Sequence, residues 1–136
     1  MSKVYAFDVD ETMYCSNGPV TLDMLVTLRK EGHIVGLCGN WGLFCQVVPN
    51  WQDYVSFINC TPAVFDQPTY GDWNLAKVWF MQHFRQYIRA EEYILVGNIK
   101  GELNSLGVVC GSEDNKFAAM AGWRFIKEDD FSRGVR

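Results

Sequence analysis

Two aspartates at the end of a short apolar run are the residues of this chain best suited to chemistry. Asp8 and Asp10 stand one residue apart, and the hydroxyl of Thr12 follows them. A carboxylate pair of this kind can hold a divalent cation, and one member can attack a phosphorus centre. The run at 4–7 predicts a buried β-strand. Because ligands of open α/β sheets bind beyond the carboxyl ends of the strands, the two acids are expected in a binding site.

The residues after this pair predict a β-α-β unit. Apolar Leu22, Leu25 and Leu28 recur at helical spacing and favour a helix over 21–31. A second apolar strand is predicted over 34–38. Two strands joined by a helix pair in parallel through a right-handed crossover. The sequence therefore indicates a parallel sheet that begins with the strand before Asp8.

The rest of the chain continues the alternation of helices and strands. The fold expected is α/β, a Rossmann-like three-layer sandwich with a central parallel sheet, as one domain over 1–136. A long loop over 99–111, with a short strand at 108–109, and a frayed polar tail over 127–136 are also expected. The remaining predicted elements are helices over 42–48, 74–89 and 115–121, and strands over 54–58, 93–96 and 123–126.

Composition narrows the range of partners and compartments. The net charge of −4, without a basic cluster, disfavours nucleic acid and anionic membranes as partners. The cysteines number 5, which is odd, and form no C-x-x-C pair, so neither a disulfide framework nor a zinc site is expected. A reducing cytoplasm fits this pattern best. No apolar run approaches the length of a membrane span.

The opening "YAFDVDETMYCSNG" resembles the first motif of the haloacid dehalogenase (HAD) superfamily of phosphatases, in particular its small-cap members. The resemblance implies a Mg²⁺-dependent hydrolysis of a phosphomonoester. Asp8 would be the nucleophile that forms an aspartyl-phosphate, and Asp10 the general acid and base. It also implies that Mg²⁺ is bound by Asp8, by the backbone carbonyl of Asp10 and by an acid from a later motif.

The second and third motifs of the family have counterparts in this chain. Cys38, Gly39 and Asn40 resemble the family's Ser-Gly-Asn phosphate-binding segment, with a thiol in place of the hydroxyl. A thiol is a weaker hydrogen-bond donor than a hydroxyl, although the backbone N–H groups of Gly39 and Asn40 remain. Lys77 fits the third motif, in which an ammonium balances the nucleophile and the phosphate. The alternative reading of Lys77 is a solvated lysine on a helix.

The fourth motif is divided in this sequence. Asn98 stands where the family has an aspartate after a strand and a glycine, and Asp114 precedes an A-x-x-A-G helix, with extra residues between them. Asn98 and Asp114 are the expected metal ligands from this motif, with Glu102 and Glu113 as alternatives for the second acid. An asparagine offers a carbonyl oxygen but no negative charge. Asn98→Asp should therefore tighten Mg²⁺ binding if Asn98 lines the site.

A minimal cap or insert is expected within 41–74, a segment too short for a large cap domain. An open site would admit a phosphorylated small molecule or a bulkier substrate, or would be covered by another subunit of an oligomer. Trp41 and Trp51 fall in this region and could stack on a substrate ring. The alternative function is a catalytically weakened relative that binds a phosphorylated ligand or a protein partner, because Cys38 and Asn98 each depart from the motif.

Overall fold

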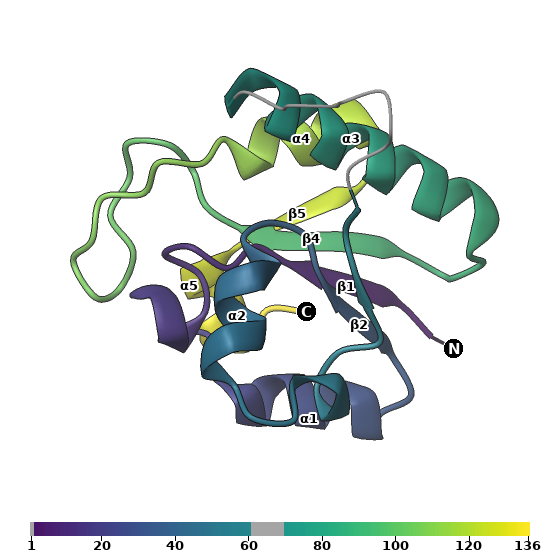
Figure 1. Ribbon diagram of the computed structural model, residues 1–136, viewed down its shortest axis with the longest axis horizontal. Helices are drawn as coiled ribbons and strands as arrows, with labels where there is room; N and C mark the ends of the chain where they lie inside the picture. Colours follow the sequence, from purple (N-terminus) through teal and green to yellow (C-terminus); the bar gives the residue numbers. More distant parts are fainter. Residues whose placement is uncertain (1, 61–69) are drawn as a thin grey trace.

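The computed structural model describes residues 2–60 and 70–136, and its strands form one parallel sheet (Figure 1). The strand order is β3-β2-β1-β4-β5, and β1 lies at the centre. The predicted α/β fold with a central parallel sheet is confirmed. The strands are β1 (Val4–Phe7), β2 (Ile34–Leu37), β3 (Phe57–Ile58), β4 (Tyr93–Gly97) and β5 (Arg124–Lys127).

Helices cover both faces of the sheet and give the three predicted layers. Helices α3 and α4 lie on one face, and α1, α2 and α5 lie on the other (Figure 1). Their bounds are α1 (Leu22–Lys30), α2 (Trp41–Val47), α3 (Tyr70–Tyr87), α4 (Asp114–Ala121) and α5 (Glu128–Ser132), with short 3₁₀ turns at η1 (Tyr14–Ser16) and η2 (Trp51–Asp53).

The central strand β1 divides its side chains between two separate cores. Tyr5 and Phe7 pack in the core under α1, α2 and α5, whereas Val4 and Ala6 pack in the core under α3 and α4. This follows from the two-residue period of a strand, which sends successive side chains to opposite faces. The same alternation continues into the loop and sends Asp8 toward the α3–α4 face.

The side of the sheet on which new strands are added changes at β1. From β1 the chain builds β2 and β3 on one side, and then returns to place β4 and β5 on the other side. The loops that leave β1 and β4 therefore diverge above the carboxyl end of the sheet. This switch point lies directly beyond Phe7, where the sequence places the aspartate pair.

The C-terminal segment corrects one expectation. Residues 127–136 were expected to fray, but Glu128–Ser132 form α5 and Phe131 is fully buried. The Phe131 ring lies 5.1 Å from that of Phe7 and 6.1 Å from that of Tyr5, measured between centroids. A single large aromatic side chain supplies enough apolar burial to hold a short polar segment against the sheet.

Much of the segment expected to hold a cap belongs to the sheet domain. Within 41–60 the chain forms α2, η2 and β3, and β3 pairs with β2. Trp51 packs against the core under α1 and α2. The part of the expected cap at 61–69 lies outside the described residues. Across 2–60 and 70–136, no helix combines the length and the apolar character needed to cross a membrane.

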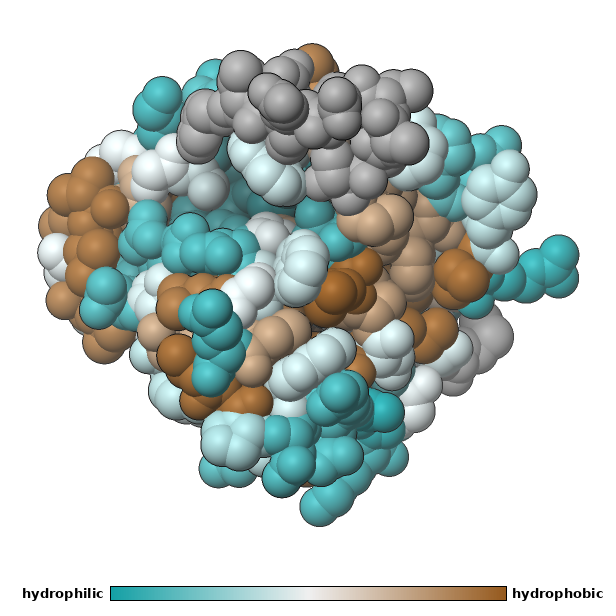
Figure 2. Space-filling view, in the orientation of Figure 1, coloured by the Kyte–Doolittle hydropathy of each residue, from teal (hydrophilic) through white to brown (hydrophobic). Residues whose placement is uncertain are grey.

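The loop between β4 and α4 carries hydrophobic surface. Leu103, Leu106 and Val109 are each more than half exposed. Figure 2 shows this hydrophobic surface at the left edge of the molecule, where the loop projects in Figure 1. The short strand expected at 108–109 is present only as a single antiparallel bridge between Leu103 and Val109.

Candidate active site

Three charged side chains meet at the carboxyl end of β1. The Lys77 ammonium lies 2.6 Å from Asp114 Oδ1 and 3.7 Å from Asp8 Oδ1. Asp8, Lys77 and Asp114 are all buried, although they come from segments far apart in the chain. Buried charges of this kind occur when they are paired, and here one cation lies between two carboxylates.

Local structure explains how Asp114 reaches this point. It is the first residue of α4, and its Oδ2 accepts a hydrogen bond of 2.9 Å from the backbone N–H of Asn98. Gly97 precedes Asn98 at the end of β4, and a Cβ on Gly97 would lie 2.3 Å from Asp114 Oδ2. The glycine therefore allows the carboxylate to approach the end of the strand.

Burial and charge perturb the acid–base properties of the group. The pKa of Asp8 is raised well above its ordinary value, first by burial and then by the charge of Asp114, while Lys77 opposes the shift. Burial lowers the pKa of Lys77, but the charges of Asp114 and Asp8 outweigh it and the net direction is upward. Lys77 is thus held in its charged form. Buried ionisable groups whose pKa values are shifted by neighbouring charges cluster at functional sites.

Asp10 occupies a more open position beside this group. Its Oδ1 accepts hydrogen bonds of 2.8 Å from the Ser16 hydroxyl and 3.4 Å from the Asn40 side-chain amide. Asp10 is only partly buried, in contrast to Asp8. The two aspartates therefore differ in environment, as two carboxylates with different roles require.

A cavity of about 650 Å³ opens over these carboxylates. Its size falls within the range of small-molecule sites. Its lining comes from the segments that follow β1 to β4 and from α3: Asp8, Asp10, Gly39, Asn40, Trp41, Gly42, Ile58, Asn59, Cys60, Trp73, Asn74, Lys77 and Ser112. Asp8, Asp10, Gly39, Asn40 and Lys77, all predicted from the sequence as site residues, therefore share one cavity.

Gly39 brings the loop after β2 close to Asp8. A Cβ at Gly39 would lie 2.2 Å from Asp8 Oδ1, so a larger residue would displace the carboxylate. The backbone N–H of Gly39 donates a hydrogen bond of 3.0 Å to Asn59 Oδ1. Sequence reasoning missed Asn59. Its position directly after β3 could have indicated it, because the carboxyl ends of all the parallel strands lie at this edge of the sheet.

The Cys38 thiol does not line the cavity, although the charges of Lys77, Asp114 and Asp8 act on it. It is fully buried in the core under α3 and α4, and burial raises its pKa to about 12. The side chain of Cys38 is directed to the same face as Ala6, in keeping with the two-residue period. Among the described residues of this segment, Gly39 and Asn40 line the cavity and the Cys38 sulfur does not. The phosphate-binding role of Cys38 remains a prediction without a supporting contact.

The Asn98 side chain lies on the opposite face of the sheet from Asp114. Its amide donates to Glu128 Oε2 at 2.9 Å and to the carbonyl oxygen of Glu11 at 3.1 Å. Its Oδ1 accepts a hydrogen bond of 3.2 Å from the Thr12 hydroxyl. Protein groups therefore occupy both polar ends of the side chain. Asn98 contacts the carboxylate group through its backbone N–H, and its role as a metal ligand remains a prediction.

The three candidates for the second acid of the fourth motif differ in position. Glu102 is exposed and lies 3.5 Å from the Lys127 ammonium, and Glu113 pairs with Lys116 at 3.0 Å. Asp114 is the one that the fold brings to Asp8 and Lys77. Geometry therefore favours Asp114 over the other two.

The site is compatible with Mg²⁺. Asp8 Oδ2 is buried and has no hydrogen-bond partner within the described residues, so it is an acceptor that a cation would satisfy. Within those same residues, no three His, Cys, Asp or Glu side chains are grouped as a complete metal site. Mg²⁺ commonly binds through one or two carboxylates and keeps several waters. The carboxylates of Asp8 and Asp114 meet that requirement, and the backbone carbonyl of Asp10 as a further ligand stays a prediction from the resemblance.

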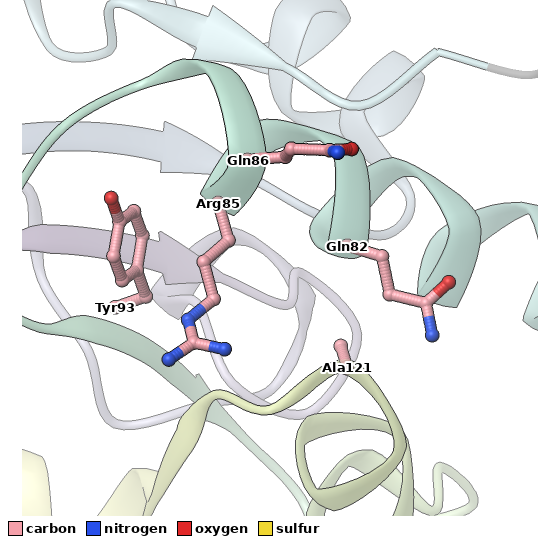
Figure 3. Close-up of a pocket in the computed structure, with 5 residues that line it drawn as sticks. All are labelled: Gln82, Arg85, Gln86, Tyr93 and Ala121. Atoms are coloured by element: carbon pink, nitrogen blue, oxygen red, sulfur yellow. The ribbon is translucent and has the colours of Figure 1, made fainter.

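A second hollow lies at the other end of the sheet. It has a volume of about 490 Å³ and is lined by Gln82, Arg85, Gln86, Tyr93 and Ala121 (Figure 3). Tyr93 begins β4, so this groove lies at the amino end of the strand. Arg85 stands over the Tyr93 ring at 5.8 Å. The described lining of this hollow carries no carboxylate, whereas Asp8 and Asp10 line the cavity at the carboxyl end.

The fold and site define a Rossmann-like parallel α/β domain with charged residues at its topological switch point. No family model, curated protein or solved structure matches the chain. Any assignment of activity therefore depends on the residues described above.

Proposed function

We propose that this protein is a Mg²⁺-dependent phosphomonoesterase that acts through an aspartyl-phosphate on Asp8, as its resemblance to HAD phosphatases implies. One observation carries the proposal: Asp8, Lys77 and Asp114 converge, buried, beneath a cavity of about 650 Å³. Phosphoryl transfer requires mainly positioning and charge neutralisation, and this group can supply both.

Asp8 would begin the reaction. One of its carboxylate oxygens bonds to phosphorus, and the bond between phosphorus and the ester oxygen breaks. Asp10, on the open side of the site, gives a proton to the departing oxygen. Lys77 offsets the negative charge that gathers on the phosphoryl group.

Asp10 would also complete the reaction. As a carboxylate it takes a proton from water, whose oxygen attacks phosphorus and releases inorganic phosphate and free Asp8. Mg²⁺, held by Asp8, Asp114 and the Asp10 carbonyl, would neutralise charge on the phosphoryl oxygens. The hydrogen bonds from Ser16 and Asn40 orient the Asp10 carboxylate for both proton transfers.

The test is a phosphatase assay on 4-nitrophenyl phosphate and a panel of phosphorylated metabolites, with and without Mg²⁺. We expect Mg²⁺-dependent release of phosphate, and a loss of at least ~1000-fold in Asp8→Asn because the nucleophile is removed. Asp23→Asn is the matched control, since Asp23 is exposed on α1. Equal rates for wild type and Asp8→Asn would contradict the proposal.

A weakened relative that binds a phosphorylated ligand is the second candidate function. The burial of the Cys38 thiol supports it, because the side chain at the position of the family's phosphate-binding hydroxyl does not line the cavity here. Binding of phosphate esters without turnover, in a protein with intact Asp8, would favour this alternative.

A further inference from the structure

The cavity over Asp8 is larger than a phosphoryl group requires. Its volume of about 650 Å³ extends from the carboxylates to Trp41 and Trp73. Trp41 begins α2 and Trp73 lies in the first turns of α3. These helices cover opposite faces of the sheet (Figure 1), and each contributes one tryptophan to the cavity lining.

Both tryptophans leave much of their surface uncovered. Trp41 is 38% exposed and Trp73 is 51% exposed, whereas Trp123 in the core is 5% exposed. A partly exposed indole that lines a cavity offers a flat apolar face, on which a ring of a ligand can stack. Two such faces above a phosphate-sized site would hold the group that the phosphate esterifies.

The charges of the cavity argue against a leaving group with further anions. Among the described lining residues, Lys77 is the only cation, and Asp114 and Asp8 already engage it. Apart from Asp8, Asp10 and Lys77, the polar lining residues are neutral, among them Asn40, Asn59, Asn74 and Ser112. A second phosphate or a carboxylate would be desolvated here without an opposite charge.

We infer that the substrates are monophosphate esters whose leaving group carries a flat, uncharged aromatic ring, which stacks on Trp41 or Trp73. The inference rests on the proposed phosphatase function. The ring is either an aryl group or a nucleobase, since both present the same flat face to an indole. The neutral amides of Asn40 and Asn74 can bond to the polar edge of such a ring.

Matched pairs of substrates test this inference without changing the ester. Adenosine 5′-monophosphate is compared with ribose 5-phosphate, and benzyl phosphate with cyclohexylmethyl phosphate. The first pair tests a nucleobase and the second an aryl group. We expect kcat/KM to be about 10-fold higher or more for the ring-bearing member of at least one pair, in line with base–aromatic stacking.

Variants of the tryptophans show where the preference arises. In the substrate pair that shows the preference, Trp41→Leu or Trp73→Leu should bring the ratio of the two kcat/KM values toward one. Trp79→Leu should keep the ratio, because Trp79 is also a partly exposed indole on α3 but stacks on His83, outside the cavity lining. Equal kcat/KM within both pairs, or a ratio unchanged in both cavity variants, would overturn the inference and leave the phosphatase proposal standing.

Calorimetric titration of Asp8→Asn with the same compounds separates the two proposals. Ring-bearing esters should bind about 10-fold more tightly than their partners, and Trp41→Leu or Trp73→Leu in the same background should remove the difference. If wild type hydrolyses nothing but this difference is found, the phosphatase proposal fails and the ring preference stands. Equal affinities within both pairs would overturn the ring preference.

Discussion

Lys77 is the residue on which the buried charges depend. Its ammonium is the only cation among the described contacts of Asp8 and Asp114. Lys77→Met would leave two carboxylates facing each other in a buried site. We expect a loss of about 3–5 kcal/mol in the free energy of unfolding, measured by urea denaturation at pH 7.

A double variant tests this explanation. Adding Asp114→Asn to Lys77→Met removes one of the two unbalanced charges and should recover about 1–3 kcal/mol of that loss. The recovery measures coupling between the two side chains. Additive losses in the double variant would show that Lys77 stabilises the protein by packing alone.

Asn98 is suited to its position because it can donate a hydrogen bond. Its amide nitrogen lies 2.9 Å from Glu128 Oε2, and burial raises the pKa of Glu128 although the Asn98 bond opposes the shift. Asn98→Asp would bring two carboxylates together there. We expect a loss of about 3 kcal/mol near pH 7 instead of tighter Mg²⁺ binding.

The pH dependence of this effect has a definite sign. A carboxyl group with a raised folded-state pKa binds its proton more tightly in the folded protein. Its contribution to stability is therefore fully present below the ordinary value of 4.5 and is lost as the pH rises through the folded pKa. Thermal unfolding of Asn98→Asp should thus improve toward acid pH. Adding Glu128→Gln to Asn98→Asp should recover stability, because the glutamine amide can donate a hydrogen bond to the new carboxylate. Tighter Mg²⁺ binding and unchanged stability in Asn98→Asp alone would refute this account.

At the scale of elements, the loop after β2 sets the position of the nucleophile. A Cβ at Gly39 would meet Asp8 Oδ1 at 2.2 Å, so Gly39→Ala should shift the carboxylate. We expect kcat/KM for a hydrolysed ester to fall by about 100-fold, because small displacements of reacting groups are costly. Gly111→Ala is the control, since the nearest atom to its Cβ lies at 4.0 Å. Equal kcat/KM in the two variants would show that Gly39 does not set the position of Asp8 for catalysis.

Phe131 is the apolar side chain that packs helix α5 against the sheet. Phe131 is fully buried between α5 and β1, and its ring lies near those of Tyr5 and Phe7. Phe131→Ala should lower the free energy of unfolding by about 3–5 kcal/mol, as measured in urea. Val135→Ala, at a side chain that is 45% exposed, should change it by less than about 0.5 kcal/mol. A small effect of Phe131→Ala would mean that the tail is docked by other contacts.

At the scale of the whole molecule, a bound cation should stabilise the fold. A ligand that binds only the folded state adds about 2.7 kcal/mol at 100 times its Kd. Mg²⁺ should therefore raise the Tm of the wild type, and the rise should be lost in Asp114→Asn. Glu102→Gln should retain it, because Glu102 pairs with Lys127 away from Asp8. An equal rise in all three proteins would place the cation elsewhere.

Much of this molecule could be predicted from periodic patterns. The apolar runs at 4–7 and 93–96 predicted the central strands, and the acids after the first run predicted the edge at which the cavity opens. The same patterns could not predict α5, because its sequence is polar except for Phe131. A single anchoring aromatic residue has no period to detect.

The sequence by itself determined the parallel α/β fold and the edge of the sheet at which Asp8 and Asp10 lie, because strand and helix periods are local properties. Lys77 was predicted through the resemblance to the third HAD motif. Only the tertiary structure decided that Asp114, and not Glu102 or Glu113, meets Lys77. It also decided that the Cys38 sulfur is buried outside the cavity lining and that the Asn98 side chain bonds to Glu128. Those choices depend on which face each strand presents and on how closely α4 approaches Gly97, and both are properties of the packed molecule.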